Sequence, residues 1–189
     1  MGDQISEVMG RLRREDFLPD DQKRFADLDE PLPIGWGQTS SQPRTVAAML
    51  RLLDVLPGMR VLDVGAGSGW TTALLATLVG AEGQVVGVEL VPQLRVRATA
   101  ALGRLHLDQA RVELAERGVL GWPVDAPYDR VLVSAQARSL PTPLLEQLAE
   151  QGAMVVPVAE RMTRVVRQTD EEVAVSEHGS YRFVPLLDW

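Results

Sequence analysis

Residues 61–70 of this 189-residue chain read VLDVGAGSGW, with three glycines at alternate positions directly after an apolar run. We expect a strand that leads into Gly65, Gly67 and Gly69, and a helix that begins at once and continues to residue 79. Glycines at such a junction let the backbone approach a ligand where any Cβ atom would collide. The start of the helix offers unpaired N–H groups and a positive dipole end. The segment therefore predicts a site for a nucleotide-like cofactor.

The spacing of these glycines indicates which cofactor the site takes. A dinucleotide site has the pattern G-x-G-x-x-G, whose third glycine lets helix and strand pack closely. This chain has G-x-G-x-G, with Trp70 where that third glycine would stand. A second apolar strand ends in Glu89, whose carboxylate can accept hydrogen bonds from both hydroxyls of a ribose. The motif and this acid together are typical of S-adenosylmethionine (SAM) sites; the structural alternative is a plain glycine turn with a surface glutamate.

The composition predicts one globular domain without a metal or thiol site. The chain is long enough for a sizeable core, and 46% of its residues are hydrophobic. The formal net charge of −7 disfavours nucleic acid and anionic membranes as partners. We find no run long enough to cross a bilayer and no signal-peptide layout. The sequence contains no cysteine, which excludes disulfides and a thiolate nucleophile. We expect a cytoplasmic monomer.

Hydrophobic periodicity predicts an α/β fold with a doubly wound, mostly parallel, seven-stranded sheet and helices on both faces. The expected strands are 60–64, 84–89, 110–115, 129–133 and 153–158, and the expected helices are 3–15, 44–56, 69–79, 92–105 and one that begins near Pro141. The tail runs 162–168, 171–176 and 181–187 leave no room for helices, so antiparallel strands should end the sheet. The Pro/Gly-rich segment 31–43 fits neither periodicity.

We expect no second domain and divide residues 1–189 into three parts. Residues 1–56 form an N-terminal helical, lid and substrate segment. Residues 57–160 form the α/β core that binds the cofactor, and residues 161–189 supply the C-terminal strands.

Nearly the whole chain resembles the protein-L-isoaspartate O-methyltransferase family. The most specific part is the segment 32–43, LPIGWGQTSSQP, and the similarity extends from REDFLP at 14–19 to FVPLL at 183–187. Shorter matches are LGWP at 120–123, APYD at 126–129, QL at 147–148 and VPV at 156–158. The resemblance implies a SAM-dependent enzyme that methylates the free α-carboxyl of isoaspartyl residues in damaged proteins and peptides. The ester then collapses to a succinimide, whose hydrolysis returns some normal aspartate.

The resemblance also implies a set of site residues. Ser41 is the matched functional serine, which we take as the catalytic residue, in a segment beside the methyl donor and the substrate carboxylate. From spacing alone, Ser40 and Ser41 are better interpreted as helix caps before Pro43; the resemblance reverses this for Ser41 and leaves Ser40 open. The expected cofactor-binding residues are Gln38, Thr39, Ser40, Asp63, Gly65, Ala66, Gly67, Ser68, Gly69, Glu89, Leu90, Glu116, Arg117 and Gly118.

This chemistry fits the residues that the chain has. A carboxylate is already ionised at pH 7, so it needs no general base to attack a sulfonium methyl group. The enzyme has to align the carboxylate oxygen with that methyl group and exclude water. A hydroxyl and backbone N–H groups can do this without histidine, cysteine or metal. We interpret His106 and His178 as structural, and Trp70 as core beneath the glycine loop.

Two segments depart from the family pattern. The family usually has Gly-Asp-Gly after the third strand, where this chain has Ala-Glu-Arg-Gly at 115–118. Arg117 thus replaces an aspartate that accepts a hydrogen bond from the adenine amino group, and arginine has no acceptor. Either Glu116 makes this contact after a small loop shift, or SAM binds more weakly; we expect binding to survive because the glycine loop and Glu89 remain. Arg138, in the second segment, either pairs with the substrate carboxylate or lies on the surface.

Three alternative functions remain open. The first is a methyltransferase dedicated to an aspartate of one peptide or partner protein. The second is a non-catalytic SAM-fold binding protein, for which Arg117 is the only support. The third, an NAD-dependent oxidoreductase, is opposed by the missing third glycine and by the lack of a visible catalytic Tyr–Lys or His pair.

Overall fold

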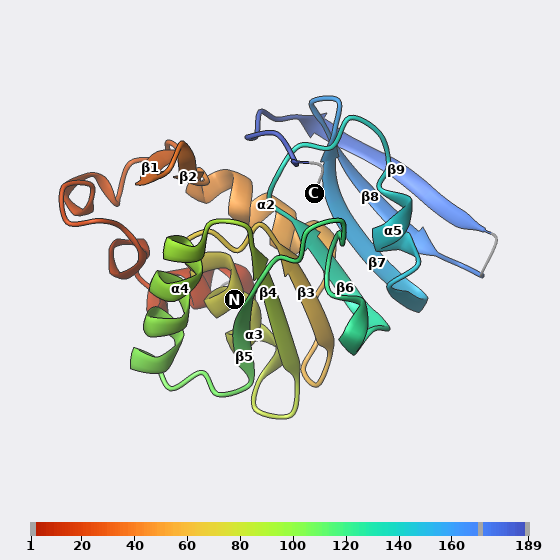
Figure 1. The fold of residues 1–189 in the computed structure, drawn as a ribbon, viewed down its shortest axis with the longest axis horizontal. Helices are drawn as coiled ribbons and strands as arrows, with labels where there is room; N and C mark the ends of the chain where they lie inside the picture. The colour runs from red at the N-terminus through yellow and green to blue at the C-terminus, as the bar shows by residue number, and fades with distance from the viewer. Residues whose placement is uncertain (1–2, 170–171, 188–189) are drawn as a thin grey trace.

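Valine-rich strands form the centre of the computed structural model, which describes residues 3–169 and 172–187. Parallel strands buried on both faces favour such continuous apolar runs. Along the sheet the strands are β5 (Ala110–Leu114), β4 (Gln84–Glu89), β3 (Arg60–Val64), β6 (Tyr128–Val133), β7 (Leu148–Val158), β8 (Arg161–Arg167) and β9 (Val173–Ser180) (Figure 1). The first five are parallel to one another, β8 is antiparallel to β7, and β9 is antiparallel to β8. The predicted sheet, with antiparallel strands at its C-terminal end, is confirmed.

The last tail run, 181–187, is not the strand that we predicted. It forms a single bridge between Pro185 and Gln136, with hydrogen bonds from Gln136 N to Val184 O and from Leu186 N to Gln136 O, both of 2.8 Å. The tail therefore crosses back to the loop after β6 and leaves β9 as the edge of the sheet. Residue 171, where we expected the preceding strand to begin, lies outside the described residues.

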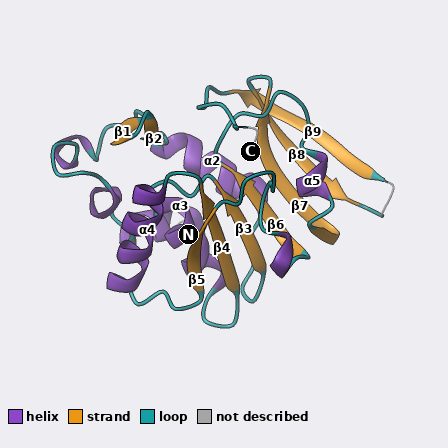
Figure 2. Cartoon of the chain, viewed as in Figure 1, coloured by secondary structure: helices purple, strands orange, loops and turns teal. Residues whose placement is uncertain are grey.

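Helices cover the two faces of the sheet unequally. One face carries α1 (Gln4–Arg11), α2 (Pro43–Leu53), α3 (Trp70–Val79) and α4 (Pro92–Arg104), whose apolar side chains share one core with Val61, Val85, Leu132 and Val155 of the strands. The other face is covered by loops, the four-residue α5 (Thr142–Leu145) beside β7, and the 3₁₀ turn η3 (Pro123–Asp125) (Figure 2). The alternation of elements predicted helices on both faces, but not this asymmetry.

The N-terminal part differs most from the prediction. The expected helix 3–15 ends at Arg11 and is followed by two 3₁₀ turns, η1 (Arg14–Phe17) and η2 (Lys23–Phe25). The segment 31–43 contains a hairpin, β1 (Leu32–Gly35) and β2 (Gln38–Ser40), which lies apart from the main sheet in Figure 1. Its turn is possible because Gly35 and Gly37 take positive φ angles of 97° and 72°. In the described part of the chain, no helix is long and apolar enough to span a bilayer.

Candidate active site

A cavity that opens to solvent lies at the carboxyl ends of β3, β4 and β6. Ligands of open α/β sheets bind at this edge. Four segments that are far apart in the sequence meet there, together with five residues from three further places. The lining consists of Ile34, residues 38–41, residues 64–68, Trp70, Thr71, residues 88–91, Ser134, Ala135 and residues 184–187.

The three glycines of the loop after β3 have different roles. Gly65, Gly67 and Gly69 all take positive φ angles, of 83°, 57° and 93°, which glycine adopts without strain. Gly65 and Gly67 line the cavity, so their lack of a side chain leaves backbone exposed to a ligand. Gly69 does not line it; a Cβ atom at this position would lie 2.9 Å from the Cβ atom of Ala98 in α4. The third glycine is therefore needed for packing between α3 and α4.

Glu89, at the end of β4, holds the glycine loop and lines the cavity. Its Oε2 atom accepts a hydrogen bond from Gly67 N at 2.7 Å, and its Oε1 atom accepts one from Val91 N at 2.9 Å. Burial raises the pKa of the Glu89 carboxyl, while these backbone donors oppose the rise. Each carboxylate oxygen has acceptor capacity beyond its one N–H partner. Glu89 can therefore accept hydrogen bonds from two ligand hydroxyls, as its position in the sequence predicts.

Asp63 lies behind the glycine loop and does not line the cavity. It is fully buried, and its Oδ2 atom accepts hydrogen bonds from the hydroxyls of Thr71 and Thr72 at 2.8 and 2.7 Å. Its Oδ1 atom has no hydrogen-bond partner among the described residues. Burial raises the pKa of this carboxyl to about 6. Asp63 thus anchors the first turn of α3; a direct contact with the cofactor remains a prediction.

Residues 38–41 form the wall that faces the glycine loop. The Ser40 hydroxyl accepts a hydrogen bond from Arg14 Nε at 3.1 Å, whereas the Ser41 hydroxyl has no hydrogen-bond partner within the described ranges. Neither serine caps α2, because the N-cap is Gln42 and the first turn is capped by Asp29, whose Oδ1 accepts from Arg44 N at 2.9 Å. The capping interpretation of the two serines is therefore wrong. The Ser41 hydroxyl is available to a ligand in the cavity.

The C-terminal tail completes the cavity, and sequence reasoning did not assign it to the site. Val184, Pro185, Leu186 and Leu187 line the side next to Ser134 and Ala135. The bridge between Pro185 and Gln136 brings the tail there. The motif FVPLL at 183–187 was the only signal in the sequence, since its apolar pattern alone also fits a strand.

Residues 116–118 lie outside the cavity. Glu116, Arg117 and Gly118 are exposed, and none of them belongs to the lining. Gly118 instead borders a neighbouring open groove, which is also lined by Arg138 and shares Leu186 and Leu187 with the cavity. Contacts of Glu116, Arg117 or Gly118 with a cofactor remain a prediction.

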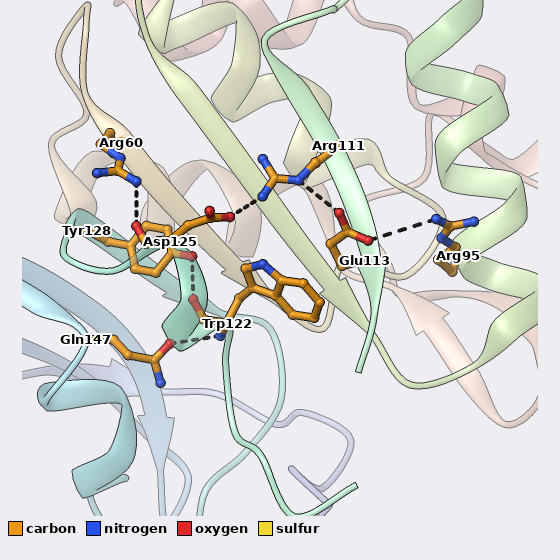
Figure 3. A network of polar contacts seen from close by, with 8 residues as sticks. All are labelled: Arg60, Arg95, Arg111, Glu113, Trp122, Asp125, Tyr128 and Gln147. Carbon is orange, nitrogen blue, oxygen red and sulfur yellow. Dashed lines mark hydrogen bonds and ion pairs between the residues drawn. The ribbon is translucent and has the colours of Figure 1, made fainter. Parts of the chain in front are cut away.

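The loop between β5 and β6 is held in place by partly buried polar contacts at its C-terminal half (Figure 3). Gln147 Oε1 accepts from Trp122 N, and Gln147 Nε2 donates to Leu120 O, both at 2.8 Å. The Tyr128 hydroxyl donates to Trp122 O at 2.7 Å, and Arg111 pairs with Asp125. These contacts fix residues 120–125, which pack beside the groove that contains Gly118. They explain why Gln147 is buried.

The described residues contain no cluster of side chains suited to a metal ion.

Comparisons with known proteins agree on one family. The family model described as Protein-L-isoaspartate(D-aspartate) O-methyltransferase (PCMT) matches residues 1–189. A curated protein-L-isoaspartate O-methyltransferase from Methanopyrus kandleri is 43% identical to this chain over 187 residues, which are 97% of this chain and 83% of that protein.

Solved structures have the same fold. One, a protein-L-isoaspartate O-methyltransferase, superposes with a TM-score of 0.86 at 27% identity; the match covers 98% of this chain and 61% of that one. Another, a putative protein-L-isoaspartate O-methyltransferase from Plasmodium falciparum in complex with S-adenosyl-L-homocysteine, has a TM-score of 0.84 at 24% identity, over 98% of this chain and 91% of that one.

Proposed function

This chain belongs to the protein-L-isoaspartate(D-aspartate) O-methyltransferase family, and we propose that the cavity between its glycine loop and Ser41 is the catalytic site. The enzyme methylates the α-carboxyl of L-isoaspartyl residues and uses SAM as methyl donor. The assignment of the site rests on one observation. The glycine loop, Glu89 and Ser41 come from three separate parts of the chain and line the same cavity.

The residues of one wall fit SAM. Gly65 and Gly67 present backbone to the cavity without side chains, and Glu89 keeps acceptor capacity for the two ribose hydroxyls. Leu90 and Val91 extend this wall beyond Glu89. When bound, SAM would supply an electrophilic methyl group. The carboxylate oxygen would provide the electron pair of the new C–O bond, and the electron pair of the broken C–S bond would stay on sulfur.

The residues of the facing wall fit the substrate carboxylate. The Ser41 hydroxyl donates a hydrogen bond to one carboxylate oxygen, which turns the other oxygen towards the methyl group. Because the carboxylate is ionised at neutral pH, no side chain has to remove a proton. Positioning is therefore the main task of the enzyme. This role for Ser41 agrees with the freedom of its hydroxyl within the described residues.

The C-terminal tail shields the reacting groups from water. Val184, Pro185 and Leu186 bring apolar surface to the cavity beside Ser134 and Ala135. Exclusion of water strengthens the hydrogen bond between Ser41 and the carboxylate and reduces competing hydrolysis.

The product and its context follow from the same chemistry. An isoaspartyl methyl ester collapses to a succinimide, and hydrolysis of the succinimide returns part of the residue to normal aspartate. The substrates are isoaspartyl-containing proteins and peptides. We further propose that the enzyme acts in the cytoplasm, as a monomer and without a nucleic-acid partner, which the net charge of −7 and the lack of cysteine support.

The variant Ser41→Ala tests the assignment of the site. We expect kcat/KM for an isoaspartyl peptide to fall about tenfold to a hundredfold, since a hydrogen bond to a charged group is lost. The Kd for S-adenosylhomocysteine should stay within about twofold, measured by calorimetry, because the cofactor wall is untouched. Ser176→Ala, on the exposed strand β9, serves as the matched control. An unchanged kcat/KM for Ser41→Ala would contradict this role.

A further inference from the structure

Arg14 is a buried arginine outside the cavity lining, at the start of η1, and only 5% of its surface is exposed. Its guanidinium makes five hydrogen bonds, all to residues 28–41, a segment that includes residues 38–41 of the cavity wall. The Nε atom donates to Ser40 Oγ at 3.1 Å, and Nη1 donates to Leu28 O at 3.1 Å. The Nη2 atom donates to Glu30 O, Ser40 O and Ser41 O at 2.8, 2.9 and 3.0 Å.

These acceptors lie at the two ends of one loop. Leu28 and Glu30 precede the β1–β2 hairpin, Ser40 is its last residue, and Ser41 follows it. A single side chain therefore closes the base of the hairpin and fixes where residues 38–41 enter the cavity wall. Arginine suits this position because its planar fork carries five donors in fixed directions.

The same side chain connects this wall to the glycine loop. The Arg14 guanidinium lies over the Trp70 ring, with 5.6 Å between its carbon and the ring centroid. Trp70 is the first residue of α3 and directly follows Gly69, and its indole N–H donates to Leu12 O at 3.2 Å. Arg14 thus contacts both the segment of Ser41 and the helix that begins at the cofactor wall.

The charge of Arg14 is not neutralised by an ion pair. All five of its acceptors are uncharged, and within residues 3–169 and 172–187 it forms no salt bridge. Asp29 is the carboxylate that acts on it, through space, and it favours the charged guanidinium. Burial lowers the pKa of the guanidinium to about 10, so it stays protonated at neutral pH. Glu89 lines the same cavity, and the whole chain carries a net charge of −7. Apart from Arg14, the protein's charge therefore repels an anionic substrate.

We propose that Arg14 is a positioning residue whose buried positive charge, set directly behind Ser40 and Ser41, favours binding of the substrate carboxylate. The inference rests on the proposed function of the cavity. Methyl transfer neutralises the carboxylate, so a fixed positive charge favours the bound substrate more than the transition state. Loss of this charge therefore acts mainly on KM for the peptide, and loss of the fork geometry acts on the order of residues 28–41.

The test compares Arg14→Gln and Arg14→Lys with Arg13→Gln, which removes an exposed arginine from the neighbouring position. The lysine variant keeps the positive charge but loses the planar set of guanidinium donors. It also provides a test of the charge if the glutamine variant folds poorly. The readouts are KM for an isoaspartyl peptide, kcat, the Kd for S-adenosylhomocysteine, and hydrogen exchange of the amides in residues 29–41, which needs no turnover.

We expect Arg14→Gln to raise the peptide KM about tenfold or more, with a smaller change in kcat, because an interaction with a charged group is lost. Arg14→Lys should raise the peptide KM less, while both variants speed exchange in residues 29–41 relative to Arg13→Gln. A peptide KM for Arg14→Gln within about twofold of the control, or an equal rise in the Kd for S-adenosylhomocysteine, would overturn the charge role.

The same measurements distinguish failure of the proposed function from failure of the role proposed for Arg14. A wild-type enzyme that does not methylate the peptide would overturn that function and the carboxylate role with it, and hydrogen exchange would still decide whether Arg14 orders the loop. Unchanged exchange in both Arg14 variants would overturn the ordering role.

Discussion

Asp63 and Glu89, two buried carboxylates near the ends of neighbouring strands, have different roles: Glu89 lines the cavity and Asp63 lies behind the glycine loop. Glu89 lines the cavity, and each of its carboxylate oxygens accepts one backbone hydrogen bond and can still accept another from a ligand. Asp63 is fully buried and, among the described residues, is hydrogen-bonded only by the hydroxyls of Thr71 and Thr72. Hydroxyl donors compensate a buried charge only in part. Asp63 should therefore influence the stability of the protein more than the affinity for its ligand.

The pH dependence of stability tests this difference. Burial raises the pKa of Asp63 from 3.8 to about 6 in the folded protein. A raised pKa means that the folded state binds the proton more tightly, so this contribution to stability is present below pH 3.8 and is lost as the pH rises through about 6. For Asp63→Asn, urea unfolding at several pH values should show that the free energy of unfolding of the wild type, relative to the variant, falls by roughly 3 kcal/mol across this window. A difference that does not vary with pH would contradict the role of Asp63.

Among the elements, the contact between α3 and α4 depends on the third glycine of the loop. Gly69 has a φ angle of 93°, and a Cβ atom there would collide with Ala98. The two helices cover β3, β4 and β5, and α3 begins at the cavity. The close approach of Gly69 to Ala98 therefore places the end of the glycine loop against α4.

Gly69→Ala should reduce the free energy of unfolding by roughly 2–4 kcal/mol, from overpacking and an unfavourable backbone conformation. Gly103→Ala is the matched control in α4, because its Cβ atom would meet nothing within 4 Å. This control should be neutral or stabilising by roughly 0.5–1 kcal/mol, since alanine favours a helix. Urea unfolding at neutral pH measures both variants, and equal stability of the two would argue against the packing role of Gly69.

The sequence predicted the elements whose stability is local. Strands 60–64 and 84–89 have the predicted bounds, because valine-rich runs between glycines and turns give a clear pattern. The β1–β2 hairpin was missed because its short strands alternate poorly and its base is closed by Arg14, a contact over 26 residues. The tail was predicted as a strand because its apolar pattern fits one, yet its partner is the loop at Gln136.

Over the whole molecule, the candidate site is an assembly of segments that no local pattern connects. The glycine loop and Glu89 were predicted as neighbours because parallel strands end at one edge of the sheet. Ser41 came only from the resemblance, since its spacing before Pro43 favoured a helix cap. The tail residues 184–187 join the cavity through a long-range bridge. The sequence thus predicts the cofactor side of the cavity, formed by the glycine loop and Glu89. The opposite side, formed by residues 38–41 and 184–187, depends on tertiary contacts.

The most direct test of the central claim is transfer of a labelled methyl group from SAM to a short isoaspartyl peptide, with the matched aspartyl peptide as control. We predict that the wild-type enzyme labels the isoaspartyl peptide alone, and that mild alkali releases the label because the product is an ester. Equal labelling of both peptides, or no labelling of either at high SAM concentration, would contradict the claim that this cavity methylates isoaspartyl carboxylates.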